Sequence, residues 1–278
     1  MGCFLIGLLV VILSIGNIIE ESPIWSCSSN NFELNPLLAS RAYVPYPLYP
    51  SSILRVTIRF RFGNISNQRV VIVMTGLGMV PCLKGVLHYG IAGNADVSLD
   101  IGDVTIPKFW AHSGLWNWQV ELYSDIGYLQ FSKYNNQSDN LLNRVWYRKK
   151  PGVREHVFWG MRLPQCVNTT CLPRPPKVTI VDRGVSASVF VDNAAYRTFL
   201  RSKFNATAID MESAAVALIC HQQALPFVVI RALSDLAGGG SDVSNEADLF
   251  GSLAAQNSVD VLVKFVGLLP THKSKTHS

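Results

Sequence analysis

The stretch that most constrains the fold is residues 205–240, in which a helical segment lies between two short apolar segments. Residues 206–209 and 226–232 have the length and the β-branched content of strands, and residues 211–224 between them read as a helix. A strand, a helix and a strand of these lengths predict one βαβ unit, from which parallel sheets are built. We therefore expect an α/β fold.

Two acidic residues follow the two predicted strands. Glu212 comes just after the first strand, and Asp235, preceded by Ser234, comes just after the second. Ligands of parallel sheets bind outside the carboxyl ends of the strands, so both carboxyl groups are candidate site residues. In the first turn of a helix, Glu212 is favoured as an ionised acceptor of hydrogen bonds from hydroxyls. If Asp235 enters the apolar environment of its strand, its pKa rises, which suits a proton donor.

A hydroxyl-binding carboxylate beside a general acid fits the cleavage of a bond between a sugar and a nitrogen base. Each residue also has a simpler interpretation. An acid early in a helix commonly serves only as a favourable first-turn residue, and a Ser-Asp pair after a strand commonly forms a turn or a cap.

Longer motifs carry a resemblance to a known family. They are DMESAAVA with PFVVIRALSD, VDRGVSASVFVDN at residues 181–193, and HYGIAGNADVSLDIGDVTIPKFWAHSGLWNWQ at residues 88–119. In these motifs the chain resembles the nucleoside phosphorylase and nucleosidase superfamily, and within it the methylthioadenosine/S-adenosylhomocysteine nucleosidases. The amino-acid sequence of the longer segments is similar to that of the plant bark storage proteins and their wound-inducible relatives. With gaps, the resemblance spans residues 32–269.

The resemblance implies a fold and two principal roles. The fold is a three-layer sandwich around a central mixed, mainly parallel sheet, lacking some of the helices of the family. Asp235 would protonate the purine at N7, and Glu212 would hold the ribose hydroxyls.

Further roles are implied for residues around these two acids. Met211 would pack under the sugar, and Phe190, in a predicted strand over residues 185–191, would stack near the base. Glu33, in the motif FELNPLL, is the candidate base that activates water. The expected catalytic residues are thus Asp235 and Glu33, and the expected substrate-binding residues are Glu212, Met211, Phe190, Ser234, Thr75 and Gly76.

The choice between phosphate and water as the nucleophile depends on an anion site. Phosphorylases of this family place an Arg before, and a Ser after, the glycine that corresponds to Gly90, where this chain has His88 and Ile91. Thr75 and the backbone N–H groups from Gly76 onward could still contact an anion or water, although glycines after a strand commonly form only a turn. The two replacements favour water.

Parts of the family scaffold are short in this chain. Residues 69–75 and 85–92 read as strands that the family joins through a helix as parallel neighbours, but only residues 77–84 lie between them. A parallel crossover needs about a dozen residues. A second family helix is missing after HVFWG at residues 156–160. The relatives enter the FELNPLL motif from a clear apolar first strand, where this chain offers only residues 23–27, and a weak or absent first strand would leave Glu33 without structural support.

The N-terminal residues predict secretion. Residues 3–16 form an apolar run of signal-peptide length that ends in small residues suited to cleavage. A membrane span requires about 20 apolar residues, and Glu20 and Glu21 interrupt the run, so we expect no stable span. At 278 residues and 49% hydrophobic composition, one large domain is expected. The predicted division is a leader at 1–26, a phosphorylase-like domain at 27–270 and a polar tail at 271–278.

Sequons and cysteines agree with the secretory route. Cys166 and Cys171 are separated by a short polar stretch of sequence, which predicts a loop closed by a disulfide. We expect a secreted plant glycoprotein, extracellular or vacuolar, with glycosylation at the four sequons Asn64, Asn136, Asn168 and Asn205.

Charge and metal-ligand spacing exclude some classes of function. The net charge of +5 owes much to a basic segment at residues 144–154, which we interpret as a solvated loop because no nucleic-acid-binding motif accompanies it. The cysteines and histidines lack zinc-ligand spacing, so we expect neither a metal nor another cofactor.

Three hypotheses remain from the sequence. The first is a purine nucleosidase-like enzyme that binds a purine nucleoside or base and, by resemblance, forms a homo-oligomer. The second is a vegetative or bark storage protein, a nitrogen store with little or no catalytic activity. The third is a truncated product without a stable fold, because two missing helices would expose apolar surface worth several kcal/mol at about 25 cal/mol per Å². Whether the protein is an enzyme stays open at this point.

Overall fold

The computed structural model describes residues 24–28, 31–46, 53–55, 58–74, 85–113, 117–119, 128–130, 155–222, 225–239 and 246–269. Its helices are α1 (Asn31–Ala39), α2 (Ala194–Phe204), α3 (Ser213–Gln222) and α4 (Glu246–Gly267), with a 3-10 turn, η1 (Glu155–Phe158). Its strands are β1 (Ile24–Ser28), β2 (Tyr43–Pro45), β3 (Ile53–Arg55), β4 (Ile58–Ile65), β5 (Gln68–Met74), β6 (Val86–Asn94), β7 (Val104–Thr105), β8 (Phe109–His112), β9 (Asn117–Gln119), β10 (Tyr128–Gln130), β11 (Cys166–Val167), β12 (Thr170–Cys171), β13 (Val178–Thr179), β14 (Arg183–Ser186), β15 (Ala206–Asp210) and β16 (Phe227–Leu236).

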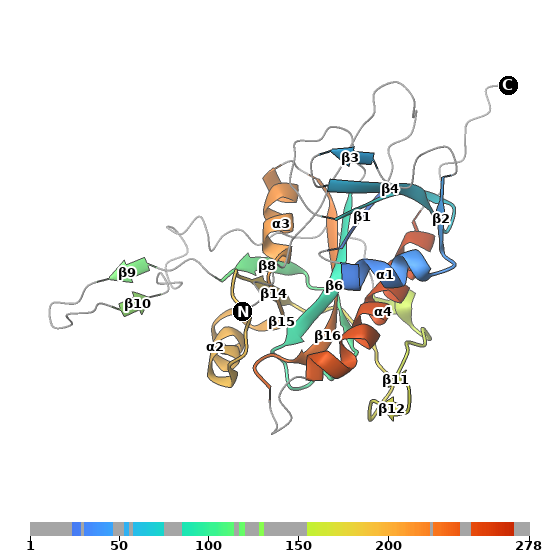
Figure 1. The fold of residues 1–278 in the computed structure, drawn as a ribbon. Coiled ribbons are helices and arrows are strands. Elements are labelled where there is room, and N and C mark those ends of the chain that lie inside the picture. Colours follow the sequence, from blue (N-terminus) through green and yellow to red (C-terminus); the bar gives the residue numbers. More distant parts are fainter. Residues whose placement is uncertain are drawn as a thin grey trace.

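Twelve of the described strands form one large mixed sheet with β6 and β16 at its centre (Figure 1), and the pairs β9–β10 and β11–β12 form two separate two-stranded sheets. Its main path runs β13-β7-β16-β6-β1-β5-β4-β2, and β3, β8, β14 and β15 pair with members of that path or with one another. β16 and β6 are parallel along nearly their whole length, and β1 is parallel to both β5 and β6. Helices flank the sheet, so the predicted three-layer fold is confirmed.

The strand order around β15 differs from the prediction. β15, α3 and β16 follow one another as expected, but β15 is antiparallel to β6 whereas β16 is parallel to it. The two strands therefore lie on opposite edges of β6 and run in opposite directions, so the predicted parallel βαβ unit is wrong. Hydrophobic pattern and length predict that a strand exists, but its direction depends on pairing with the distant strand β6.

The first strand is also a correction. The sequence suggested that it is weak or absent, yet β1 lies between β5 and β6 and pairs with both. β5 and β6 are therefore not direct neighbours. β1 begins at Ile24, within the range predicted as leader, and residues 75–84, where the missing crossover helix was sought, lie outside the described part of the chain.

The two faces of the sheet carry different kinds of side chain. Leu87 and Tyr89 of β6, with Ile230 and Ala232 of β16, belong to the main core, which α1 and α4 complete. Successive residues of a strand point to opposite faces, so His88 and Arg231 point the other way, toward α3. In Figure 1, α1 and α4 lie to the right of β6 and α2 and α3 to its left.

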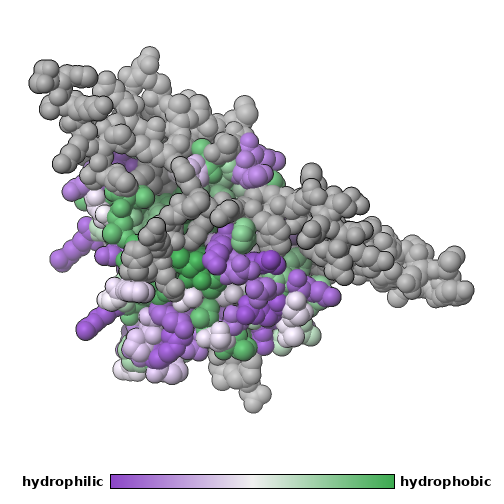
Figure 2. Space-filling model, turned by 180° about the vertical axis from the view of Figure 1, so that it is seen from behind, coloured by the Kyte–Doolittle hydropathy of each residue, from purple (hydrophilic) through white to green (hydrophobic). Residues whose placement is uncertain are grey.

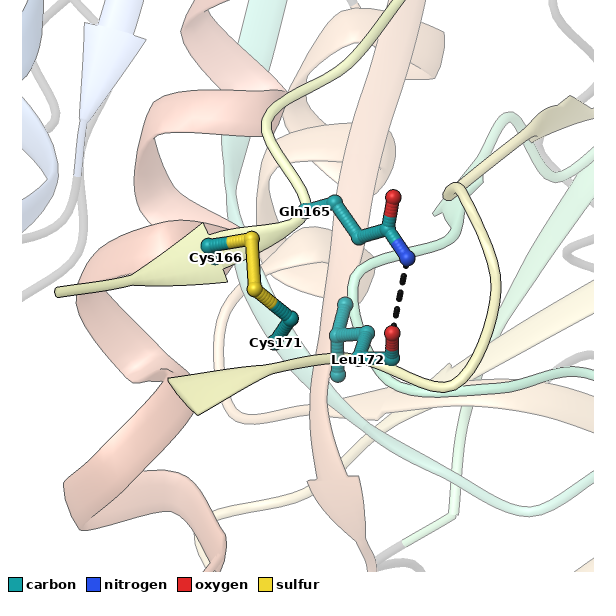
Figure 3. Close-up of a disulfide and its surroundings, with 4 residues drawn as sticks. All are labelled: Gln165, Cys166, Cys171 and Leu172. Atoms are coloured by element: carbon teal, nitrogen blue, oxygen red, sulfur yellow. Dashed lines mark hydrogen bonds between the residues drawn. A yellow bond between two sulfur atoms is a disulfide. The ribbon is translucent and has the colours of Figure 1, made fainter. Parts of the chain in front are cut away.

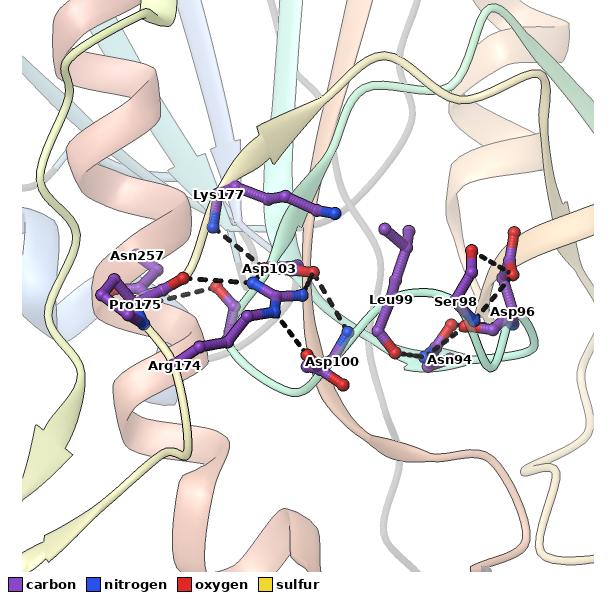
Figure 4. Close-up of polar contacts among 11 residues, drawn as sticks. Asn94, Asp96, Ser98, Leu99, Asp100, Asp103, Arg174, Pro175, Lys177 and Asn257 are labelled. Carbon is purple, nitrogen blue, oxygen red and sulfur yellow. Dashed lines mark hydrogen bonds and ion pairs between the residues drawn. The ribbon is translucent and has the colours of Figure 1, made fainter.

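A buried carboxylate fixes the turn that leads into β7. Asp103, with no exposed surface, accepts two hydrogen bonds from the Arg174 guanidinium, at 2.8 and 2.6 Å, and others from the amides of Lys177 and Asp100 (Figure 4). The same turn is bound to β16, because Gly102 and Asp103 exchange backbone hydrogen bonds with Leu233 at 2.7 and 2.8 Å. The turn therefore supports β16 just before Ser234 and Asp235.

A short hairpin, β11–β12, adjoins this turn. Cys166 and Cys171 face each other across the hairpin and are joined by a disulfide (Figure 3). Beside it, the Gln165 side chain donates to the carbonyl oxygen of Leu172 at 2.7 Å. Cys220 is instead a buried free thiol in α3, and its burial raises its pKa to about 12, so it packs as a small apolar group.

The described surface is mixed in character. Seen from behind, it carries hydrophilic patches with smaller hydrophobic ones between them (Figure 2). Among the described helices, none combines the length and the apolar composition that a membrane crossing needs.

Candidate functional site

An arginine with no exposed surface lies in the middle of the apolar strand β16. Arg231 is the only charged residue between Phe227 and Leu233, and a buried guanidinium is stable only when carboxylates and hydrogen-bond acceptors surround it. Its Nε lies 2.7 Å from Oδ2 of Asp210, and its Nη2 lies 3.5 Å from Oε2 of Glu212. Its Nη1 donates to the carbonyl oxygen of Ile91 at 3.3 Å. Arg231 thus joins the ends of β15 and α3 to the central strands.

Asp210, at the end of β15, is the hub of this cluster. Its carboxylate accepts from the hydroxyls of Ser186 and Ser213, and from the backbone N–H groups of Glu212 and Ser213 at 3.2 and 3.1 Å. With Arg231, five donor groups converge on one buried carboxylate. The first N–H groups of a helix lack partners within the helix, so Asp210 also caps α3.

Two serines complete the cluster. The hydroxyl of Ser186, at the end of β14, donates to Asp210 and accepts from the amide of Ala214 at 2.9 Å. The hydroxyl of Ser213 donates to Asp210 and accepts from Nε of Arg231 at 3.1 Å. Because each hydroxyl acts as both donor and acceptor, β14, β15, α3 and β16 are held in one hydrogen-bonded network.

Glu212 is a nearly buried member of this cluster. It lies at the start of α3, where its carboxylate is close to the positive charge of Arg231. The sequence predicted Glu212 in the first helical turn, but α3 begins at Ser213, so Glu212 lies just before the helix, with Arg231 of β16 as its charged partner. An ionised carboxylate held in this way can accept hydrogen bonds from hydroxyl groups of a ligand.

His88 contributes a neutral ring to the cluster. Burial and the nearby charge of Arg231 lower its pKa well below the ordinary value for histidine. Its Nε2 lies against Nη2 of Arg231, which can only donate, so Nε2 accepts and the ring proton is on Nδ1. His88 therefore adds no positive charge to the site.

Asp235 lies further along β16, half-buried over Gly93 of β6. The hydroxyl of the buried residue Ser234 donates to Oδ1 of Asp235 at 2.6 Å, so Ser234 orients the acid. A Cβ atom at Gly93 would lie 2.9 Å from the Cβ of Ala237, which is too close, and in ordinary contact, at 3.7 Å, with Oδ2 of Asp235. Asp235 and Ile209 both pair with Gly93, which places the two backbones roughly 10 Å apart across β6.

The other predicted site residues have different outcomes. Met211 is half-buried between Asp210 and Glu212, and Phe190 is 64% exposed. Phe190 does not lie in a strand, because β14 ends at Ser186 and residues 187–193 form the connection to α2. Glu33 lies in α1, but its side chain is outside the description, and Thr75, Gly76 and Asn136 lie outside the described residues.

Three of the four sequons fall in described segments. Asn168, at the tip of the β11–β12 hairpin, and Asn205, directly after α2, are exposed and have positive φ angles. Asn64 is half-buried in β4, where its Oδ1 accepts from the hydroxyl of Tyr46 at 3.1 Å.

Sequence reasoning missed Asp210, Arg231, Ser186 and Ser213, and noted His88 only for the anion site. One signal was present, because an arginine inside an apolar strand requires buried carboxylates nearby. Which acids pair with it could not be read from the sequence, since Asp210 and Arg231 meet only through the strand order. Among the described residues, no group of three or more His, Cys, Asp and Glu side chains is arranged to hold a metal ion.

Comparison with known proteins identifies the class to which this fold belongs. Residues 27–267 match the family model of the phosphorylase superfamily, so the chain belongs to this superfamily. Within it, the chain is 31% identical to bark storage protein A of Populus deltoides over 249 residues, which cover 77% of this chain and 78% of that one. It is 30% identical to the 5′-methylthioadenosine/S-adenosylhomocysteine nucleosidase of Lysinibacillus sphaericus (strain C3-41) over 220 residues, 74% of this chain and 85% of that one.

Solved structures show the same fold at low sequence identity. The 5′-methylthioadenosine/S-adenosylhomocysteine nucleosidase of Helicobacter pylori, in complex with butyl-thio-DADMe-Immucillin-A, has a TM-score of 0.63 at 18% identity, with 90% of this chain and 100% of that chain covered. The futalosine hydrolase of Helicobacter pylori has a TM-score of 0.61 at 19% identity, with 89% of this chain and 98% of that chain covered.

Proposed function

We propose that the protein hydrolyses the N-glycosidic bond of a purine nucleoside. The observation that supports this proposal is that two unlike acids belong to strand ends that meet at one residue of β6: Glu212 follows β15 and Asp235 lies near the end of β16, and both strands pair with β6 at Gly93. Glu212 is charge-compensated by Arg231, and Asp235 is half-buried and oriented by Ser234. This is the division of roles that the reaction needs, with one carboxylate for sugar hydroxyls and one acid for the leaving base.

The relatives support the choice of substrate class. The curated nucleosidase relatives are named for 5′-methylthioadenosine and S-adenosylhomocysteine, and solved neighbours hold immucillins or 5-methylthiotubericidin. A mutant of the Helicobacter pylori nucleosidase in which Asn replaces an Asp was solved with 5′-methylthioadenosine in its active site. A purine nucleoside or base is therefore the ligand we propose for this chain.

The proposed reaction balances as follows. The bond between C1′ and the purine nitrogen breaks with both electrons leaving on the base, and Asp235 gives its proton to N7. Glu212 accepts hydrogen bonds from the ribose hydroxyls, which hold the sugar while positive charge develops at C1′. Water adds to C1′, and its proton passes to a base, for which we propose Glu33. Phe190 would stack on the purine and Met211 would pack under the ribose.

The charges of the described cluster favour water over phosphate. The single buried guanidinium, Arg231, already faces two carboxylates, Asp210 and Glu212, and His88 is neutral. A phosphate dianion placed there would add negative charge without a free cation among the described side chains of the cluster. Ile91 also removes the hydroxyl that the family's phosphorylases offer.

Release of adenine from 5′-methylthioadenosine or adenosine tests the proposal. Asp235→Asn should lower kcat about 10²- to 10⁴-fold through loss of the general acid. Glu212→Gln should mainly raise KM, by about tenfold, through loss of the charge-assisted bonds to the sugar. Asp100→Asn, at an exposed carboxylate, is the matched control and should match the wild type.

The sugar product distinguishes the nucleophiles. Hydrolysis gives the free sugar (ribose from adenosine, 5-methylthioribose from 5′-methylthioadenosine) whether or not inorganic phosphate is present, whereas phosphorolysis gives the sugar 1-phosphate and requires phosphate. Equal rates for the wild type and Asp235→Asn, or no base release from any purine nucleoside, would rule out the proposed enzyme.

A storage role is the second candidate, favoured by the similarity to bark storage proteins. A nitrogen store would accumulate and decline with the season, and it would show no base release that depends on Asp235. The abundance of the protein through a growth cycle, measured beside the adenine assay, separates the two functions.

We also propose that the protein enters the secretory pathway and ends outside the cell or in the vacuole. The disulfide and the exposed sequons at Asn168 and Asn205 suit that route. After expression from plant cells with its own N-terminus, glycosidase treatment should lower the mass, and Asn168→Gln and Asn205→Gln should each remove one glycan. A mass equal to that of the bare polypeptide would contradict the route.

A homo-oligomer belongs to the same proposal. Trp159 is 79% exposed in the single chain, and its burial against a second copy would remove apolar surface from water. Light scattering in solution should give a mass that is a multiple of one chain.

A further inference from the structure

The segment after Asp235 meets the first turn of α2. Residues 237–239 follow β16, and α2 begins at Ala194, directly after the connection that carries Phe190. The proposed acid and the proposed base-stacking residue are therefore each a few residues from the same contact. No residue of this contact belongs to the cluster around Arg231.

Arg197 of α2 is the polar part of the contact. Its Nη1 donates to the carbonyl oxygens of Ala237 at 2.7 Å and of Gly239 at 2.5 Å. Hydrogen bonds from a charged donor are about twice as strong as neutral ones. One guanidinium thus bridges both ends of the turn that follows the acid. The amide of Arg197 donates to the carbonyl oxygen of Asn193 at 2.9 Å, so its base is fixed in the helix.

Gly238 makes the contact close enough for this bridge. Its φ is +80°, and a Cβ there would overlap the backbone of Asn193 and lie 2.7 Å from the amide nitrogen of Ala194. Asn193 is the N-cap of α2, and its side chain accepts from the amide of Tyr196 at 2.9 Å. The turn therefore packs directly on the capped start of the helix.

Apolar packing also joins the segment after Asp235 to the segment that carries Phe190. Ala237 and Val191 are both buried in one core cluster, which also holds Leu200 of α2. Val191 is the residue after Phe190, and Ala237 is two residues after Asp235. Movement of either segment would therefore disturb the other.

We propose that Arg197 is a positioning residue that holds the Asp235 turn and the Phe190 segment in a fixed relation, so that the purine is stacked and protonated in one geometry. The proposal rests on the proposed function for its chemical meaning, but the contact itself can be measured without any activity. Arg197 touches neither substrate nor reacting atoms, and it acts only through the backbone that it holds.

Amide hydrogen exchange is the direct test. In Arg197→Ala, the amides of Ala237, Gly239 and Tyr196 should exchange at least about fivefold faster. The reason is that the hydrogen bonds of Arg197 would no longer hold the turn against α2, so both segments would open more often. Arg201→Ala is the matched control. Arg201 lies one turn further along α2, where it pairs with Asp96 at 2.6 Å and donates to the carbonyl oxygen of Ala206 at 3.1 Å. Its loss should leave those three amides unchanged.

Kinetics with 5′-methylthioadenosine add a readout that a purely structural role would not move. In Arg197→Ala, kcat should fall about tenfold and KM should rise several-fold, because both protonation and stacking are misplaced. Arg197→Lys keeps a cationic donor on a long side chain and should recover most of both values. Arg201→Ala should keep wild-type kcat and KM, whatever its effect on the melting temperature.

The outcomes separate this inference from the proposed function. Unchanged exchange in Arg197→Ala, or faster exchange on one side only, overturns the inference. Faster exchange on both sides with unchanged kcat and KM overturns it too, since the contact would then be structural alone. If the wild type releases no base, the proposed function is wrong. The exchange data would still show whether Arg197 holds the two segments together.

Discussion

At the scale of single residues, the molecule depends on one buried arginine. Arg231 compensates Asp210 and Glu212 and touches His88, so its loss would leave two carboxylates without a cation. The sequence shows the arginine and both acids, but only the structure shows that they share one site.

Arg231→Met should lower the free energy of unfolding by about 3–5 kcal/mol, because an unpaired buried charge is more costly than the pair. Denaturant titration followed by circular dichroism measures this. Arg162→Met, at an exposed position, should change stability by less than about 0.5 kcal/mol. A small effect at Arg231 would mean that the carboxylates are compensated from elsewhere.

His88 should make the protein less stable in mild acid. Burial and Arg231 lower its pKa in the folded state, whereas the unfolded chain binds a proton near pH 6.5. The unfolded state therefore holds more protons below that pH, and the free energy of unfolding should fall by up to about 1.4 kcal/mol per pH unit as the pH drops. Above about pH 7 the effect is absent.

The comparison of wild type and His88→Gln between about pH 7 and pH 5 isolates this effect. The variant should lose the additional acid sensitivity, and His221→Gln, at an exposed histidine on α3, should keep it. Parallel pH curves for wild type and His88→Gln would show that His88 is not held neutral.

At the scale of elements, the turn at Asp103 determines how β16 is held. Its carboxylate ties residues 174–177 to the turn, and the turn is hydrogen-bonded to Leu233. In addition, the hydroxyl of Thr105 in β7 donates to the carbonyl oxygen of Arg231 at 2.9 Å. Local changes here should therefore reach the strand that carries both the arginine and the acid.

Asp103→Asn should cost about 2 kcal/mol of stability, since a fully buried carboxylate loses its charge-assisted bonds to Arg174. Asp100→Asn removes a partner of the same guanidinium, but Asp100 is 53% exposed and water screens the pair. That control should cost less than about 1 kcal/mol. Thermal unfolding of both variants measures the contrast, and equal losses would refute the assigned difference in burial.

At the scale of the whole molecule, the ends of the described chain close one core. Leu34 and Leu37 of α1 and Leu262 and Val266 of α4 belong to the same buried cluster as β6 and β16. The side chain of Gln68 also donates to the carbonyl oxygen of Leu269 at 3.0 Å. A main core that includes helices from both the N-terminal and the C-terminal part of the described chain favours all-or-none unfolding.

Thermal unfolding should therefore show one cooperative transition. Adenine at about 100 times its dissociation constant should add roughly 2.7 kcal/mol of stability if it binds the folded site alone. Calorimetry with and without adenine measures both quantities, and cytosine is the control ligand. Two separate transitions would contradict this all-or-none behaviour. The absence of any transition would support the hypothesis of a truncated product without a stable fold.

The sequence by itself determined the approximate positions of several elements and two candidate acids. Apolar runs and a helical segment defined β15, α3 and β16 within a few residues, and the polar positions at their ends identified Glu212 and Asp235, because these signals are local. The tertiary structure alone decided the direction of β15, the insertion of β1 between β5 and β6, and the meeting of Asp210 with Arg231. Those features depend on which distant strands pair, and pairing is settled by the packing of the whole sheet rather than by any short stretch of sequence.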